Sequence, residues 1–148
     1  MATRSGAEYL ASLQDGRSVW HRGREVEDVT VEPGIGRGTQ TLADFLDRQL
    51  EPDGQEKLTF EEDGERFSMS FLMPKSVEDV KKRGIAYYEW AKWSNGMFGR
   101  TPDYKNASVM AFAGAADFLN GNLTSDSPTD FAANMRAYYR AARSNDYV

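Results

Sequence analysis

The stretch GMFGRTPDYKN (residues 96–106) decides which fold and function this chain is expected to have. Thr101 suits the cap position before a helix. Pro102 suits the first helical position, because the N–H group that proline lacks would be unpaired there. The sequence therefore predicts a helix that begins at Pro102, with Arg100 just outside it and Tyr104 one turn in. Both side chains can point at the same small volume.

That volume is predicted to be electropositive. The Arg100 guanidinium carries a permanent charge and five donors, and the free N–H groups of a helix start add partial positive charge. Tyr104 adds a phenol that can donate or accept a hydrogen bond. Such a place would hold an anionic oxygen of a phenolate, a carboxylate or a reduced flavin. Spacing alone favours a plainer alternative, in which Arg100 pairs with a surface carboxylate and Tyr104 fills the edge of a core.

Composition sets the broad class. The 148 residues suffice for one domain, and the net charge of −5 gives no electrostatic case for binding nucleic acid or an anionic membrane. Because the chain has no cysteine, disulfides and thiolate metal sites are excluded, and His21, its only histidine, is expected at the surface without a metal. Neither an apolar signal core nor a transmembrane run is present, so the expected location is the cytoplasm.

Capping and periodicity predict an α+β class that is mainly helical with two β-hairpins. The first hairpin is expected around Arg22-Gly23-Arg24, and the glycine-rich run 33–38 is expected to be a turn rather than a nucleotide loop, because no βαβ unit surrounds it. Helices are predicted over residues 6–15, with a capping box at residues 5–8, and over residues 39–49 (ended by 51–54). Further helices are predicted over 76–94, capped by residues 76–79, and over 102–120, with a last helix capped by 127–130.

The second hairpin is the clearest local feature. Asp63-Gly64 suits a two-residue type I′ turn, and counting outward places Phe60 opposite Phe67 and Glu61 opposite Arg66. This register places the apolar residues on one face and the polar residues on the other. We therefore expect Gly64 to have a positive φ.

For the helices after this hairpin, the spacing of apolar and small residues predicts which face is buried. The small residues 111–116 predict a helix central in a bundle, and Trp90 and Trp93 are expected to pack in the core, with a role as walls of the site as the alternative. The predicted buried side of helix 76–94 consists of Val77, Val80, Gly84, Tyr87, Tyr88 and Ala91, and that of the last helix of Phe131, Met135, Tyr138 and Ala142.

The run 94–106 resembles the signature of the 4-hydroxyphenylacetate 3-hydroxylase family, the oxygenase components of two-component phenol monooxygenases that use reduced flavin. The resemblance covers nearly the whole chain but only the N-terminal part of the much longer family members. Further similar stretches are residues 8–17, 19–20, 26–30, 138–140 and 144–146.

The resemblance implies the N-terminal domain, residues 1–148, of an acyl-CoA-dehydrogenase-like flavoprotein without its β domain and C-terminal bundle. It implies ortho-hydroxylation of a phenol such as 4-hydroxyphenylacetate with O2 and reduced FAD, or FMN, from a separate reductase. The family's phenol-binding arginine and tyrosine match Arg100 and Tyr104, and its third partner, a histidine, would lie just beyond Val148. A homotetramer is implied for the complete enzyme.

Two alternatives remain open. A related flavin-dependent hydroxyacyl-CoA dehydratase would need cysteine ligands for an iron–sulfur cluster and lacks the run from Arg100 to Tyr104. A non-catalytic stand-alone module is the other. As a fragment of a longer enzyme, the chain by itself is expected neither to bind reduced FAD tightly nor to hydroxylate a phenol. It is also expected to expose an apolar surface on its last two helices.

Overall fold

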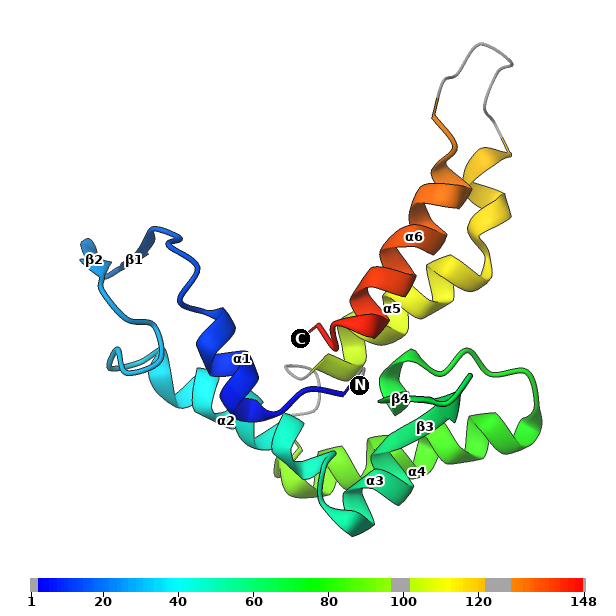
Figure 1. Cartoon of the computed structure of the whole chain (residues 1–148), viewed down its shortest axis with the longest axis horizontal. Helices are drawn as coiled ribbons and strands as arrows, with labels where there is room; N and C mark the ends of the chain where they lie inside the picture. Colours follow the sequence, from blue (N-terminus) through cyan, green and yellow to red (C-terminus); the bar gives the residue numbers. More distant parts are fainter. Residues whose placement is uncertain (1–2, 97–101, 122–128, 148) are drawn as a thin grey trace.

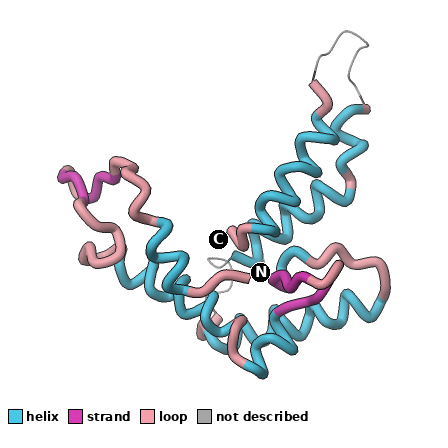
Figure 2. Tube along the Cα trace, in the orientation of Figure 1, coloured by secondary structure: helices cyan, strands magenta, loops and turns pink. Residues whose placement is uncertain are grey.

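The computed structural model describes residues 3–96, 102–121 and 129–147 and confirms a mainly helical chain with two small antiparallel sheets. Figures 1 and 2 show three groups of elements, formed by α1 and α2 with one hairpin, by α3 and α4 with the other, and by α5 packed on α6. The elements are α1 (Gly6–Ser12), β1 (Val19–His21), β2 (Arg24–Val26), α2 (Gly36–Arg48), α3 (Pro52–Leu58), β3 (Thr59–Glu62), β4 (Glu65–Ser68), η1 (Met69–Phe71), α4 (Val77–Trp93), α5 (Pro102–Gly114), η3 (Ala116–Asn120) and α6 (Phe131–Ser144).

Helix α1 begins with the capping box that the sequence predicts. The Ser5 hydroxyl accepts from the Glu8 N–H at 3.2 Å, and the Glu8 carboxylate accepts from the Ser5 N–H at 2.7 Å. The helix ends at Ser12 rather than near residue 15. Its first residue packs closely on α2: a Cβ on Gly6 would lie 2.5 Å from the Ala43 carbonyl oxygen, so only glycine fits there.

The first hairpin has a two-residue turn in which Arg22 and Gly23 both have positive φ. His21 is not a free surface histidine as predicted. It is half-buried, and its Nδ1 lies 3.1 Å from Oε1 of the buried Glu32, which also accepts from Arg24 at 2.6 Å. The carboxylate therefore anchors the hairpin to the loop that precedes α2.

Helix α2 begins at Gly36, three residues earlier than predicted, because the loop before it already winds: the N–H groups of Ile35 and Gly36 both donate to the Glu32 carbonyl. Helix α3 was not predicted, since Pro52 suggested only a helix end. Pro52 instead occupies the first turn of a new helix, where its missing N–H costs nothing.

The second hairpin has the predicted register. Phe60 lies opposite Phe67 with ring centroids 5.6 Å apart, and Gly64 has φ 77°. The division into one apolar and one polar face is only partly right, because Thr59 and Ser68 on the polar face are buried. The polar face is exposed only toward the turn.

Helix α4 is capped as predicted by Ser76, whose hydroxyl accepts from the Asp79 N–H at 3.1 Å. Its predicted buried side is wrong. Val77 is 74% exposed, and the buried residues are Arg83, Ala86 and Trp90. A count of apolar residues misses this face because the arginine on it turns inward.

The pair of α5 and α6 encloses a core with the end of the second hairpin. The N-cap of α6 is Asp130, which accepts from the Ala133 N–H at 2.9 Å, and α5 ends at Gly114 before the separate η3 turn. Only one side of α5 is covered, so the expectation of a central helix is not met within this chain. The buried members of this core are Phe71, Met110, Ala113, Tyr139 and Ala142, so Tyr139 rather than Tyr138 points inward.

Candidate functional site

The helix that carries the candidate site begins where the sequence predicts. α5 starts at Pro102, and Tyr104 lies in its first turn with its side chain 66% exposed. Thr101 and Arg100, the other predicted site residue, lie outside the described residues. The exposed phenol of Tyr104 is therefore accessible to a ligand, while its pairing with Arg100 stays a prediction.

The Asn106 side chain holds the start of α5 to two other parts of the chain. Its side chain is 5% exposed, and Nδ2 donates to the Ser70 hydroxyl at 3.1 Å and to the Tyr147 carbonyl at 3.0 Å. One amide thus ties the first turns of α5 both to η1 and to the segment after α6. This role of Asn106 could not be predicted from the sequence, because nothing in the helix sequence indicates which distant residues an asparagine contacts.

A buried carboxyl, that of Asp146, lies beside this anchor. Gln49 Nε2 donates to Asp146 Oδ2 at 3.0 Å, which joins the end of α2 to the end of α6 across 97 residues of sequence. Burial raises the pKa of Asp146 to about 6, against the opposing effects of the Gln49 hydrogen bond and of Arg4. The sequence reasoning used Asp146 only for family resemblance and gave no sign of its burial.

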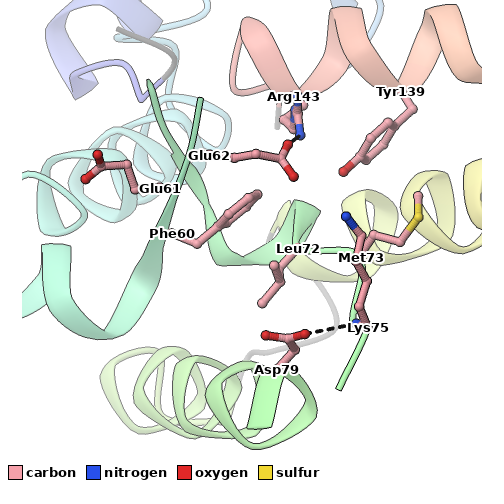
Figure 3. Close-up of a pocket in the computed structure, with 9 residues that line it drawn as sticks. All are labelled: Phe60, Glu61, Glu62, Leu72, Met73, Lys75, Asp79, Tyr139 and Arg143. Carbon is pink, nitrogen blue, oxygen red and sulfur yellow. Dashed lines mark hydrogen bonds and ion pairs between the residues drawn. The ribbon is translucent and has the colours of Figure 1, made fainter. Parts of the chain in front are cut away.

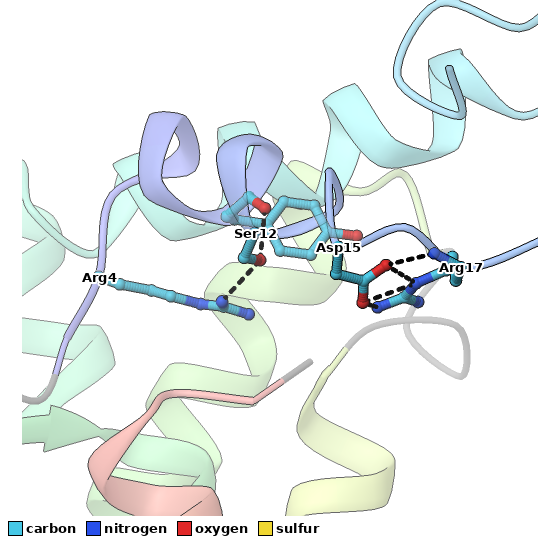
Figure 4. A network of polar contacts seen from close by, with 5 residues as sticks. Arg4, Ser12, Asp15 and Arg17 are labelled. Atoms are coloured by element: carbon cyan, nitrogen blue, oxygen red, sulfur yellow. Dashed lines mark hydrogen bonds and ion pairs between the residues drawn. The ribbon is translucent and has the colours of Figure 1, made fainter. Parts of the chain in front are cut away.

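The N-terminal segment beside α1 carries a polar network (Figure 4). Arg4 Nη1 donates to the Ser12 hydroxyl at 3.3 Å, and the Arg4 guanidinium lies 5.1 Å from the centre of the Tyr9 ring. Further along, Arg17 Nε donates to Asp15 at 2.7 Å, and hydrogen bonds from Arg17 hold the pKa of Asp15 at about 2. These arginines already have partners and fix the segment around α1.

A pocket of about 380 Å³ lies between the second hairpin and α6 (Figure 3). Arg143 points into it but forms an ion pair with Glu62 and stacks 4.1 Å from the centre of the Phe67 ring. The Tyr139 hydroxyl donates to the Phe71 carbonyl at 2.7 Å. Within this pocket Arg143 and Glu62 are therefore engaged with each other, although Arg143 Nε is buried without a hydrogen-bond partner among the described residues, and the pocket does not include Tyr104.

The two tryptophans that precede the signature differ in burial. Trp90 is buried in the core with Phe45, while Trp93 is half-exposed and meets the Phe45 ring edge-on at 4.4 Å. Both line a largely apolar pocket of about 250 Å³ at the end of α4, next to Arg48. Core packing, as expected, accounts for Trp90.

Among the described residues, no cluster of histidine and carboxylate side chains could hold a metal ion. Within the same ranges, no helix is both long and apolar enough to cross a membrane.

Comparisons with known proteins identify the family to which this fold, with its Tyr104-bearing helix, belongs. Residues 5–148 match the family described as 4-hydroxyphenylacetate 3-hydroxylase N terminal, and the chain belongs to this family.

Curated relatives and solved structures agree with this assignment. The chain is 44% identical over 144 residues to the 4-hydroxyphenylacetate 3-monooxygenase oxygenase component of Thermus thermophilus, a match that covers 97% of this chain and 28% of the relative. The corresponding component of Geobacillus sp. is 37% identical, with 99% and 29% covered. A crystal structure of such an oxygenase component complexed with FAD and 4-hydroxyphenylacetate is 45% identical, with a TM-score of 0.86, and 97% of this chain and 28% of that one are covered.

The chain therefore spans a little over a quarter of the length of the curated relatives that it matches.

Proposed function

We propose that residues 1–148 form the N-terminal domain of a two-component aromatic monooxygenase. The complete enzyme would hydroxylate a phenol such as 4-hydroxyphenylacetate at the ortho position, with O2 and with reduced FAD supplied by a separate reductase. The observation that carries this proposal is the similarity, at 45% identity and a TM-score of 0.86, to an oxygenase crystallised with both FAD and 4-hydroxyphenylacetate.

Arg100 and Tyr104 are the residues to which we assign the phenol. A guanidinium and a phenolic hydroxyl that both bind the substrate oxygen would lower the pKa of the substrate and favour its phenolate form. Electron density from the phenolate oxygen then activates the ring carbon ortho to it. In support, the start of α5 lies where the signature predicts, Tyr104 is exposed, and Asn106 holds that turn to two other elements.

The flavin, when bound, supplies the oxygen-transfer chemistry. A cofactor of that size needs an enclosing, largely apolar pocket. The pockets at Arg143 and at Trp93 measure about 380 and 250 Å³, and in the first the Arg143 guanidinium is already paired with Glu62. Neither pocket holds the whole cofactor, so further parts of the enzyme would supply most of the enclosure.

FAD is proposed over FMN because the similar structure is a complex with FAD. The oxygenase names of the relatives support a monooxygenase over the dehydratase alternative, as does the absence of cysteine in the chain. A homotetrameric enzyme is proposed on the family resemblance alone, and a cytoplasmic location stays the expectation drawn from the sequence.

A chimera tests this function. This chain replaces the matched N-terminal segment of the Thermus thermophilus oxygenase component, and the product is assayed with a flavin reductase, O2 and 4-hydroxyphenylacetate. We expect the chimera to form the catechol. The unmodified relative serves as the positive control. A chimera that folds and binds reduced FAD but forms no catechol would contradict the proposal.

A further inference from the structure

Asp146 combines burial with an unusual backbone conformation. It is 1% exposed, and its φ of 45° lies in the left-handed region. Its N–H donates to the Arg143 carbonyl at 3.3 Å, and the Tyr147 N–H donates to the Ala142 carbonyl at 3.1 Å. These two bonds form a Schellman motif, in which glycine is the usual residue at the position of Asp146. A carboxyl therefore stands where the backbone alone favours glycine, which points to a use for the side chain.

The side chain joins three segments. Gln49 Nε2, at the end of α2, donates to its Oδ2 at 3.0 Å, and the backbone of Arg4 lies near enough to lower the pKa of the same carboxyl. The charged group that lowers the pKa of the Asp146 carboxyl is the Arg4 guanidinium in the N-terminal segment. The residue of α2 that contacts the carboxyl is Gln49, which is neutral. In Figure 1 the N-terminal segment and the end of α6 meet beside the start of α5.

The other end of the Gln49 amide lacks a partner. Within the described part of the chain, Gln49 Oε1 is buried and accepts no hydrogen bond. A buried acceptor without a donor is costly. Asp146 thus engages only the N–H end of this amide, and that hydrogen bond favours the charged form of the carboxyl.

Asn106 connects this pair to the signature helix. Its Nδ2 donates to the carbonyl of Tyr147, the residue directly after Asp146. Asn106 lies two residues after Tyr104 on α5. A shift of the end of α6 caused by the carboxyl would therefore move the first turn of α5, which carries Tyr104, through the Asn106 side chain.

We propose that Asp146 is a proton-controlled positioning residue, whose carboxyl sets how the end of α6 holds the first turn of α5 and with it Tyr104. Its importance for phenol binding rests on the proposed function, whereas the coupling between Asp146 and α5 does not. Because burial raises the pKa of this carboxyl to about 6, the proton is gained as the pH falls through the range in which ordinary aspartates stay charged.

NMR titration of the 148-residue chain tests the coupling without substrate. The Asp146 carboxyl carbon and the side-chain amide of Asn106 are followed from neutral to acidic pH. We expect both to change with one common midpoint near 6. A carboxyl midpoint at the ordinary value for aspartate, or a raised midpoint with no change at Asn106, would overturn the proposal.

Three variants separate this coupling from a purely structural role. Asp146→Asn should remove the Asn106 transition, and Glu65→Gln, a change at the exposed hairpin tip, should leave it unchanged. Gln49→Met removes the donor that lowers the pKa of Asp146, so the common midpoint should move upward. If Asp146→Asn does not fold, the wild type and Gln49→Met still decide: a midpoint that Gln49→Met leaves in place or lowers contradicts the proposal. No activity is measured, so a failure of the phenol assignment leaves the result intact.

Discussion

The guanidinium of Arg83 donates to the carbonyl oxygen of Leu72 at 2.7 Å. The same Nη1 also reaches the Ser70 carbonyl at 3.1 Å, and Nη2 donates to the Tyr87 hydroxyl. A buried cation on α4 thus satisfies the backbone carbonyls of the η1 turn that follows the second hairpin. This contact joins α4 to the segment that also receives Asn106 from α5, through Ser70.

Replacing Arg83 with methionine should destabilise the chain. Methionine fills much of the volume but leaves buried carbonyls without donors, which costs about 1–3 kcal/mol in the free energy of unfolding. Urea denaturation followed by circular dichroism measures this change. The exposed neighbour gives a control, because Lys82→Met should change stability by far less. Equal effects of the two substitutions would show that the buried contacts of Arg83 contribute nothing.

Two glycine-to-alanine changes should act in opposite directions. Gly64 has φ 77° in the hairpin turn, and alanine there should cost about 1–2 kcal/mol because of its Cβ. Gly84 lies within α4, where an added Cβ would meet nothing within 4 Å, so Gly84→Ala should stabilise by about 0.5–1 kcal/mol. Thermal unfolding of the two variants checks both signs, and a destabilising Gly84→Ala would mean that α4 is not helical at this point.

The outer side of α5, η3 and α6 should promote self-association of the chain. Phe118 is 86% exposed and Phe112 is 59% exposed, and exposed apolar groups of this size favour contact between molecules. Sedimentation velocity over a concentration series should therefore show association that weakens in the double variant Phe112→Ser/Phe118→Ser. Glu65→Gln, at the exposed tip of the second hairpin, removes no apolar group and serves as the control, which should leave association unchanged. A wild type that stays monomeric throughout the series would contradict this expectation.

The sequence predicted correctly those features that depend on residues close together in the chain. The Ser5 capping box and the Asp63-Gly64 turn depend on residues adjacent in sequence, and both are confirmed. The buried side of α4 could not be predicted in this way, because Arg83 is turned inward by carbonyls more than ten residues away.

The candidate site shows the same division. The start of α5 at Pro102 follows from capping preferences and is confirmed. The junction of Gln49 with Asp146 depends on a contact across 97 residues, for which no periodicity or spacing gives a signal. The pairing of Arg100 with Tyr104 comes from the family resemblance and stays a prediction.

The assignment of the phenol to Arg100 and Tyr104 is tested most directly by product yield in the chimera with the Thermus thermophilus relative. Arg100→Ala and Tyr104→Phe should each remove about 2–4 kcal/mol of stabilisation at the developing oxyanion. We predict that catechol formation falls in both variants while flavin oxidation continues with release of peroxide, and that Tyr138→Phe, an exposed tyrosine on α6, has no such effect. Catechol yield unchanged in both Arg100→Ala and Tyr104→Phe would contradict the account.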